Sequence, residues 1–224
     1  MYFTLYLNLY IIIGMKKLVI IGAGGFAKSV IDSVDKTKYE LVGFVDEFSK
    51  VTEHCGLPIL AKSFEDLPPD KGYVYFIAIG NNLFRKRWYK KLDEQNLEII
   101  NVVDPTAVIS SGAVLGKGVF VGKMAIINND AVIGNNCIIN TRSLVEHGCN
   151  IGDSANISTN TVINGDVKIG EGSFIGSCSV VIGQIKIGCW STVGAGAVVI
   201  RDVGDGVTVA GIPARQIKVG AMLG

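Results

Sequence analysis

The sequence feature that most constrains the fold is an aliphatic residue at every sixth position from Val103 to Val199. Leu, Ile or Val occupies each of these positions without interruption, and the residue two places earlier is mostly small. A period of six does not match the 3.6-residue period of an α-helix, so no helix face would keep these side chains buried. The pattern instead predicts short extended segments separated by bends, each with one inward-facing aliphatic side chain.

Three such segments make a triangular coil of 18 residues, and successive coils stack on one another. With a strand spacing of about 4.8 Å, the stack would be a prism on the order of 25 Å tall. Gly, Asn and Asp follow many of the aliphatic residues and suit corners that need a positive φ. A β-sandwich would show period-two strands and turns of irregular length. The unbroken register therefore predicts an all-β parallel β-helix of hexapeptide repeats over residues 101–224.

Composition narrows the functional classes. The 224 residues include 21 Lys and Arg and 20 Asp and Glu. Such a small net charge does not favour binding to nucleic acid or to an anionic membrane. The five cysteines form no CxxC pair, and an odd count argues against a disulfide framework or a structural zinc site. Cys137 and Cys149 fall at small, inward positions of the repeat, where buried thiols are expected. These features predict a cytoplasmic protein.

Residues 1–14 are apolar but too short to span a bilayer, and they lack the basic start and cleavage site of a signal peptide. We expect an N-terminal extension without a role in chemistry. An amphipathic surface anchor is the alternative, which the absence of Lys and Arg in the segment disfavours.

Residues 15–100 predict a Rossmann-like α/β domain. A buried strand at 18–21 leads into a turn with Gly22, Gly24 and Gly25, then a helix at 28–34 and a second strand at 41–45 that ends at Asp46. Glycines let the backbone approach a phosphate, and a helix N-terminus favours negative charge. The turn therefore predicts a phosphate site, with Asp46 placed to hold a ribose hydroxyl or a base. Close helix packing without a ligand is the alternative.

A third strand at 73–79 ends in Gly80-Asn81-Asn82 and is followed by a helix at 83–94 and a short strand at 97–103. No second βαβ half follows, which favours a mononucleotide or nucleotide-sugar over a dinucleotide. Asn81 lies at a strand's carboxyl end, where ligands bind in open α/β sheets. Arg85 has two interpretations, a contact to phosphate or a place on a solvated helix face.

Only two histidines occur in the chain. His54 lies in irregular sequence and is expected at the surface. His147 follows an inward aliphatic residue by two places, so it lies near a prism corner, with Gly165 one coil above it. An imidazole beside Glu146 and a position without a side chain suits a general base next to a reacting carbonyl. An exposed histidine without a role is the alternative.

Seven segments together resemble the bacterial sugar acetyltransferases, which include UDP-4-amino-sugar, perosamine and sialic acid acetyltransferases. They are GAGGFAKSV, GFVDE, IAIGNN, the hexapeptides, NTRSLVEHGCNIG, NGDVKIG and AGIPAR, and the similarity extends over residues 15 to 218. The resemblance implies a left-handed β-helix, whereas the general crossover rule would favour the right hand. It also implies transfer of acetyl from acetyl-CoA to the amine of a nucleotide-linked sugar, without a metal.

The resemblance further implies roles for single residues. His147 would be the base, Asn140 would line the acceptor site, and the N–H of Gly165 would meet the acetyl carbonyl. The nucleotide-sugar would lie on Gly22, Gly24, Gly25 and Asp46. Acetyl-CoA would lie between neighbouring prisms of a homotrimer, with Arg215 and Lys218 near its phosphates.

Three positions depart from the family pattern. Gly148 stands where an acidic residue often follows the histidine, so Glu146 would have to orient the imidazole. Asn156 and Phe26 each replace a histidine. Three other functions are considered: O-acetyl transfer to a sialic-acid-like sugar, a non-catalytic sugar-binding module, and a prism-type carbonic anhydrase. The last needs several histidine ligands per metal, and the repeat holds only one histidine.

Overall fold

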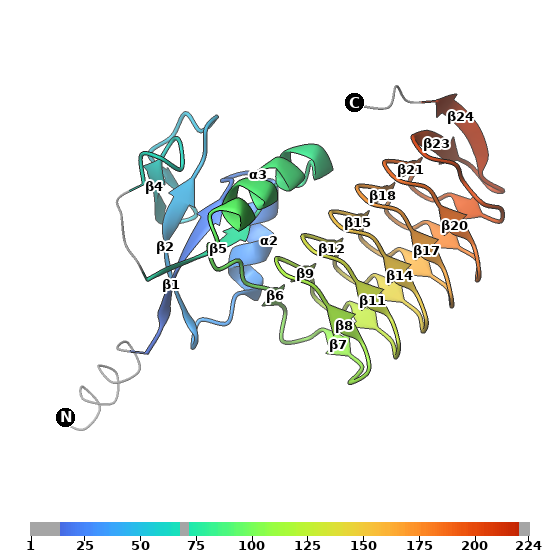
Figure 1. Ribbon diagram of the computed structural model, residues 1–224, viewed down its shortest axis with the longest axis horizontal. Coiled ribbons are helices and arrows are strands. Elements are labelled where there is room, and N and C mark those ends of the chain that lie inside the picture. Colours follow the sequence, from blue (N-terminus) through green and yellow to red (C-terminus); the bar gives the residue numbers. More distant parts are fainter. Residues whose placement is uncertain (1–13, 68–71, 220–224) are drawn as a thin grey trace.

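The computed structural model describes residues 14–67 and 72–219, so the predicted N-terminal extension lies outside the described residues apart from Gly14. The chain forms an α/β part, coloured blue to green in Figure 1, beside a long prism coloured green to red. None of the helices in the described residues is long and apolar enough to cross a bilayer.

The α/β part is a five-stranded sheet in the order β3-β4-β2-β1-β5. Its elements are β1 (Lys16–Ile21), α2 (Gly25–Ser33), β2 (Tyr39–Val45), β3 (Glu53–His54), β4 (Leu57–Ala61), β5 (Tyr73–Ile77) and α3 (Asn82–Glu94). Strand β1 pairs in parallel with both β2 and β5, as the predicted βαβ order requires. The short β3 and β4 were not predicted, and the predicted strand at 97–103 is divided into a bridge between Ile99 and Tyr75 and a two-residue strand at Val102–Val103 that belongs to the prism.

The prism has three faces, each a parallel stack of strands. The docked face, which carries the α/β part, contains β6 (Val102–Val103), β9 (Phe120–Val121), β12 (Ile138–Ile139), β15 (Asn156–Ile157), β18 (Phe174–Ile175), β21 (Thr192–Val193), β23 (Val207–Ala210) and the antiparallel β24 (Arg215–Val219). The aliphatic face contains β7 (Val108–Ile109), β10 (Ile126–Ile127), β13 (Leu144–Val145), β16 (Val162–Ile163), β19 (Val180–Val181) and β22 (Val198–Val199). The polar face contains β8 (Val114–Leu115), β11 (Val132–Ile133), β14 (Asn150–Ile151), β17 (Lys168–Ile169) and β20 (Lys186–Ile187).

The predicted inward residues form the prism core. From Val121 to Val199 every sixth side chain is at most 3% exposed, which confirms the repeat register. Full burial of such a side chain stabilises the fold by roughly 1.5–3 kcal/mol. Val103 is 36% exposed because no coil lies beneath the first one. Cys137 and Cys149 are buried as predicted, and burial raises the pKa of the Cys137 thiol to about 12.

The register changes once, near the C-terminal end of the prism. Val199 pairs with Val181, 18 residues earlier, whereas Val203 bridges to Ile187, only 16 residues earlier. The corner between the aliphatic and polar faces is therefore two residues shorter in this last coil, at Ile200–Asp202.

Two sets of polar contacts join the α/β part to the prism, beside apolar packing against Phe120. At the base, Asp104 accepts a hydrogen bond from Ser33 Oγ at 2.7 Å, and Lys123 Nζ lies 3.0 Å from Asp32 and 3.2 Å from Asp104. Burial alone raises the pKa of Asp104, but hydrogen bonds from Thr106, Ser33 and Lys123 outweigh it and hold that pKa at about 2. The second set centres on Arg85.

Candidate active site

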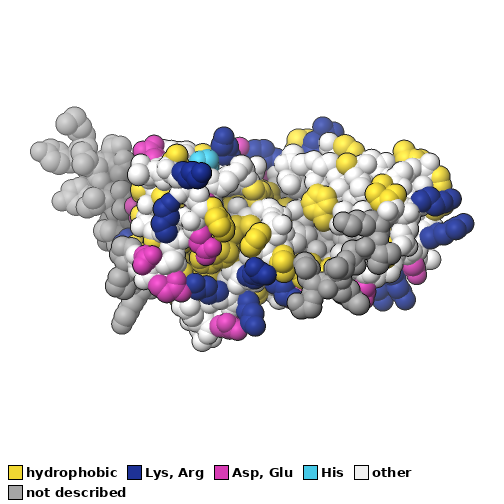
Figure 2. Space-filling model, turned by 90° about the horizontal axis from the view of Figure 1, so that it is seen from above, with side chains coloured by type: hydrophobic (Ala, Val, Ile, Leu, Met, Phe, Trp, Pro, Cys, Tyr) yellow, Lys and Arg dark blue, Asp and Glu magenta, His cyan; other side chains and the backbone are white. Residues whose placement is uncertain are grey.

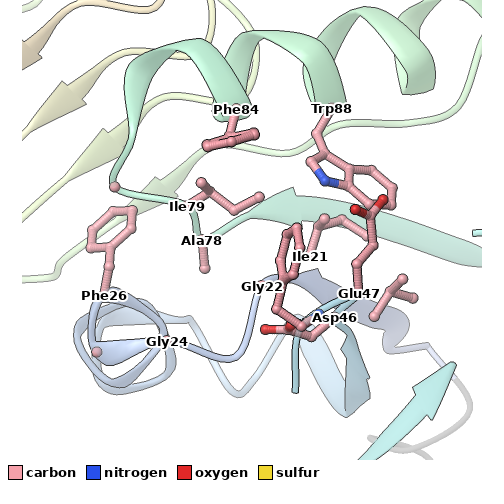
Figure 3. A pocket seen from close by; sticks show the side chains of 14 residues that line it. Ile21, Gly22, Gly24, Phe26, Asp46, Glu47, Ala78, Ile79, Phe84 and Trp88 are labelled. Carbon is pink, nitrogen blue, oxygen red and sulfur yellow. The ribbon is translucent and has the colours of Figure 1, made fainter. Parts of the chain in front are cut away.

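A cavity of about 430 Å³ lies at the carboxyl ends of β1, β2 and β5. Figure 3 shows the glycine turn and Asp46 on one side of it, with Phe84 and Trp88 from α3 on the other. Four residues predicted to bind substrate, Gly22, Gly24, Gly25 and Asp46, line this one cavity. Parallel strands end at the same sheet edge, which brings these separate segments together.

The glycine turn leaves the start of α2 open. A Cβ on Gly22, whose φ is +95°, would lie 2.8 Å from the Ile79 side chain, so the close approach of turn and strand requires glycine. Gly24 is the N-cap of α2, it has no side-chain cap, and the first turn contains no acidic residue. The first amides of a helix have no intrahelical acceptor and favour an anion. This helix end therefore suits a phosphate.

Asp46 holds the turn in place through its side chain. Its Oδ2 accepts a hydrogen bond from Ala23 N at 2.6 Å, and its Oδ1 accepts from Phe48 N and Ser49 N at 2.8 Å each. The carboxylate thus ties the glycine turn after β1 to the loop after β2. A direct contact from Asp46 to a ligand stays a prediction.

The other walls of the cavity are aromatic and were missed in the sequence. Phe84 and Trp88 project from one face of α3 at i and i+4, and Phe48 is 79% exposed beside them. Helical spacing after a strand end is the signal that would have found the first two. Asn81 caps α3, because its Oδ1 accepts from Phe84 N at 3.0 Å, and its predicted contact with substrate stays a prediction.

Phe26 connects this cavity to the prism. Its ring meets that of Phe120 on β9 edge to face, with the centroids 5.0 Å apart. The residue that replaces a family histidine is therefore both a cavity wall and a packing contact with the docked face.

The second group of predicted residues lies at the corner between the aliphatic and polar faces. His147 follows β13 and is exposed, as predicted. Glu146 Oε2 accepts hydrogen bonds from Asn128 Nδ2 at 2.9 Å and from the His147 backbone N at 3.3 Å. Among the described residues no hydrogen bond joins Glu146 to the imidazole, so its orienting role stays a prediction.

Gly165 lies directly against the His147 ring. A Cβ on Gly165 would be 2.7 Å from Cε1 and 2.8 Å from Nε2 of the imidazole. One coil further on, a Cβ on Gly183 would be 3.1 Å from Gly165 O. Two successive coils without side chains leave a strip of open backbone above the histidine. Within the described part of the chain, Gly165 N–H donates to no acceptor.

At the end of this strip lies a basic hollow of about 330 Å³. Two arginines and one carboxylate line it: Arg201 and Asp202, from the shortened corner, and Arg215, from β24. Arg215 is exposed, which fits its predicted contact with phosphates, and Arg201 was not predicted. Basic side chains gather at this end of the prism in Figure 2. The side chain of Lys218 lies outside the described residues.

Two departures from the family pattern have a structural explanation. Gly148 has a φ of +66°, and a Cβ there would lie 2.2 Å from Asp166 Oδ1, so Asp166 fills the space that an acidic side chain would need. Asn156 lies on β15 of the docked face and is 7% exposed. It therefore does not share the His147 corner.

Asn140 and His147 lie at opposite ends of β13. Asn140 is at the corner between the docked and aliphatic faces, where its Oδ1 accepts from Thr141 N at 2.8 Å. The strand separates it from His147, so a single chain does not bring the two predicted site residues together.

Two sequence-based interpretations are wrong. Arg85 is neither free to bind phosphate nor solvated, since it is 1% exposed and donates hydrogen bonds to prism carbonyls. His54 is not a simple surface residue. It is half-buried, its ring meets that of Phe44 at 5.5 Å, and its Nε2 is buried without a partner among the described residues.

The contact between Gly165 and the imidazole predicts the effect of a single methyl group. Gly165→Ala should push the His147 ring from its position and lower kcat by about 10²-fold, the cost of misplacing a reacting group by about 1 Å. Gly165→Val should in addition weaken acetyl-CoA binding more than sugar binding. Calorimetry and steady-state kinetics would check both. Equal loss of both ligands would indicate a distorted coil instead.

Comparisons with known proteins match both parts of the chain. The family model of the PglD N-terminal domain matches residues 17–92, and the bacterial transferase hexapeptide model (six repeats) matches residues 148–183. UDP-N-acetylbacillosamine N-acetyltransferase of Bacillus subtilis is 37% identical over 113 residues. That match covers 48% of this chain and spans about half, 51%, of the relative.

Solved structures match nearly the whole chain. PerB from Caulobacter crescentus, in complex with CoA and GDP-perosamine, is 33% identical with a TM-score of 0.83, over 90% of this chain and 97% of that chain. The acetyltransferase domain of PglB from Neisseria gonorrhoeae, in complex with acetyl coenzyme A, is 31% identical with a TM-score of 0.85, over 91% and 100%. These matches confirm the predicted fold, an α/β domain followed by a left-handed β-helix.

Proposed function

The chain belongs to the hexapeptide-repeat sugar acyltransferases, and we propose that it transfers acetyl from acetyl-CoA to the amino group of a nucleotide-linked amino sugar. The observation that carries this proposal is the His147 imidazole against the side-chain-free backbone of Gly165. A base beside an open strip of backbone amides is what acyl transfer to an amine needs.

The proposed reaction is direct, without an acyl-enzyme. The sugar amine attacks the thioester carbonyl, a C–N bond forms and the C–S bond breaks, and His147 takes a proton from the amine and returns it to the leaving CoA thiolate. General-base help is typically worth about 10²–10⁴ in rate. The Gly165 N–H would donate to the developing oxyanion, a contact whose loss costs about 10²–10³.

The strip above His147 fits the pantetheine arm of acetyl-CoA. Gly165 and Gly183 present no side chains there, and Arg201 and Arg215 line the hollow near its end. Guanidinium groups are suited to paired hydrogen bonds with phosphate oxygens. The thioester would then lie next to the imidazole, with the nucleotide end of CoA toward the last coil.

The cavity of the α/β part fits the nucleotide of the acceptor. The uncapped start of α2 would face the phosphates, with Gly22, Gly24 and Gly25 allowing close approach. Phe84 and Trp88 offer aromatic surfaces for the base. The complexes of relatives with GDP-perosamine and with acetyl coenzyme A support two separate sites of this kind.

The aliphatic face supports assembly into a homotrimer. Its outward side chains are apolar in every coil: Val108, Ile126, Leu144, Val162, Val180 and Val198. The outward positions of the polar face instead become Asn150, Lys168 and Lys186. A continuous apolar face on a soluble prism marks an interface, and threefold symmetry would close it. That packing would bring Asn140 of one chain to His147 of the next.

A charge on this face should therefore break the assembly. Val162→Lys places a cation in the middle of the aliphatic face, and we expect monomers in sedimentation and loss of transferase activity. Asn150→Lys, an outward position on the polar face, is the matched control and should stay trimeric and active. A Val162→Lys monomer with full activity at assay concentrations would contradict the shared site.

A second experiment tests whether two neighbouring chains share one active site. Mixing His147→Ala chains with Asn140→Ala chains should restore part of the activity in hybrid trimers, since some interfaces then contain both intact residues. Each homogeneous variant sets the baseline, and no recovery on mixing would place both residues in one chain's site.

The function itself is tested by thiol release from acetyl-CoA with a panel of acceptors. We expect release with GDP-perosamine or with UDP-linked 4-amino sugars, and none with a free sialic acid. Release only with the hydroxyl acceptor would indicate O-acetyl transfer. Lack of both release and CoA binding in calorimetry would favour a sugar-binding module.

A further inference from the structure

Arg85 is the largest fully buried side chain of the described residues, and it contacts both the α/β part and the prism. It stands in the first turn of α3. Its Nη1 donates to Ile79 O at 3.1 Å, Gly80 O at 3.2 Å and Asn82 Oδ1 at 3.0 Å. Ile79 and Gly80 line the cavity of the α/β part. One side of the guanidinium therefore holds the cavity wall.

The other side of the guanidinium holds the prism. Nε donates to Asn136 O at 2.9 Å, and Nη2 donates to Ser154 O at 2.7 Å and Ala155 O at 3.4 Å. Asn136 and Ser154 occupy the same corner position in successive coils, both with a φ of 58°. The chain between them is one complete coil, and that coil carries His147.

Asn82 extends the contact to the next coil. Its Nδ2 donates to Gly172 O at 3.0 Å and Ser173 O at 3.2 Å. The strand end after β5 is thus tied to three successive coils at one corner. Every prism acceptor in this set is a backbone carbonyl. The contact therefore depends on the position of the coil backbone and not on the prism side chains.

We propose that Arg85 is a positioning residue for acetyl transfer, which fixes the nucleotide cavity relative to the coil that carries both Asn140 and His147. This inference rests on the proposed function. If the nucleotide is held in the cavity, the position of the sugar amine relative to the prism depends on how the α/β part is held against the prism. The planar guanidinium holds both parts at once, which the single ammonium of a lysine does not.

The test is Arg85→Lys, studied below its melting temperature. Binding of GDP, UDP and acetyl-CoA by calorimetry should stay within about twofold of wild type, while kcat with the nucleotide amino sugar falls by about 10²-fold. Lys86→Ala is the matched control. Lys86 is the next residue of α3 and pairs with Glu171 at the same prism corner, so its loss should leave kcat unchanged.

Unchanged kcat in Arg85→Lys would overturn the inference, and so would a loss of binding that accounts for the whole fall in activity. If Arg85→Lys does not fold, Asn82→Ala decides: several-fold lower kcat with intact binding supports the inference, and unchanged kcat overturns it. If wild type acetylates no nucleotide sugar, the proposed function fails. The connection that Arg85 makes between the cavity wall and the prism is then measured by hydrogen exchange. Faster exchange at both 79–82 and 136–155 in Arg85→Lys would support the inference, and faster exchange at only one of the two segments would refute it.

Discussion

His147→Ala is expected to lower kcat by about 10²–10⁴-fold while acetyl-CoA binding and assembly stay intact. The side chain is exposed at a prism corner and makes no core contact, so its removal should leave the coil unchanged. The fall should appear in kcat more than in KM, because the proton transfer belongs to the transition state. Steady-state kinetics with saturating acetyl-CoA and sedimentation of the same sample would measure both effects.

The other histidine supplies the control for this prediction. His54→Gln changes the one remaining imidazole, in the α/β part, and should keep kcat near wild type. Full activity of His147→Ala would remove His147 from the mechanism. A fall in kcat accompanied by loss of the proposed assembly would point to a structural role.

Arg85→Ala is expected to lower the free energy of unfolding by roughly 3–5 kcal/mol, because it removes the donor of several buried acceptors at once. Burial lowers the pKa of Arg85 to about 10, which still leaves it charged at neutral pH. The substitution would leave carbonyls of two coils and of the cavity wall without their donor, and each unsatisfied buried group costs about 1–3 kcal/mol.

Urea denaturation at fixed protein concentration would measure this loss, since assembly makes apparent stability depend on concentration. Arg87→Ala is the matched control. Arg87 lies on the same helix but is exposed, with its guanidinium 5.5 Å from the Phe84 ring, so a change within about 0.5 kcal/mol is expected. Equal effects of the two substitutions would show that the buried contacts of Arg85 contribute little.

The prism was predictable because the pattern of buried residues alone specifies it. An aliphatic side chain at every sixth position is compatible with one architecture, the triangular coil. The 18-residue period then predicts which residues, far apart in sequence, are neighbours in successive coils. The stacking of Gly165 on His147 followed from this register and is confirmed by the geometry. The glycine turn and Asp46 were found for a similar reason, since a strand, a turn and a helix in that order fix one sheet edge.

The parts that were missed depend on contacts between distant segments. Arg85 reads as a surface cation because the residues beside it on α3 are Lys86 and Arg87, and its acceptors are backbone carbonyls that no sequence pattern marks. Strand β4 contains Pro58 and only five residues, so its pairing with β2 decides its conformation. The placement of Asn140 at a different corner from His147 was missed because the resemblance assigned a role to each residue without placing it in the coil.

The regular register also limits how the spacing between the two ligand sites can change. Inserting one residue within a strand of the prism would turn the side chains after it away from the core, because the position in the coil decides which way a side chain points. With the corners unchanged in length, only an insertion of a whole coil, 18 residues, preserves the core. Such an insertion between Asn136, whose carbonyl accepts from Arg85, and His147 would move His147 along the prism axis by about 4.8 Å. The distance along the prism axis between the nucleotide cavity and His147 can therefore change only in steps of about one strand spacing, and the length of the proposed acceptor must match one of these steps.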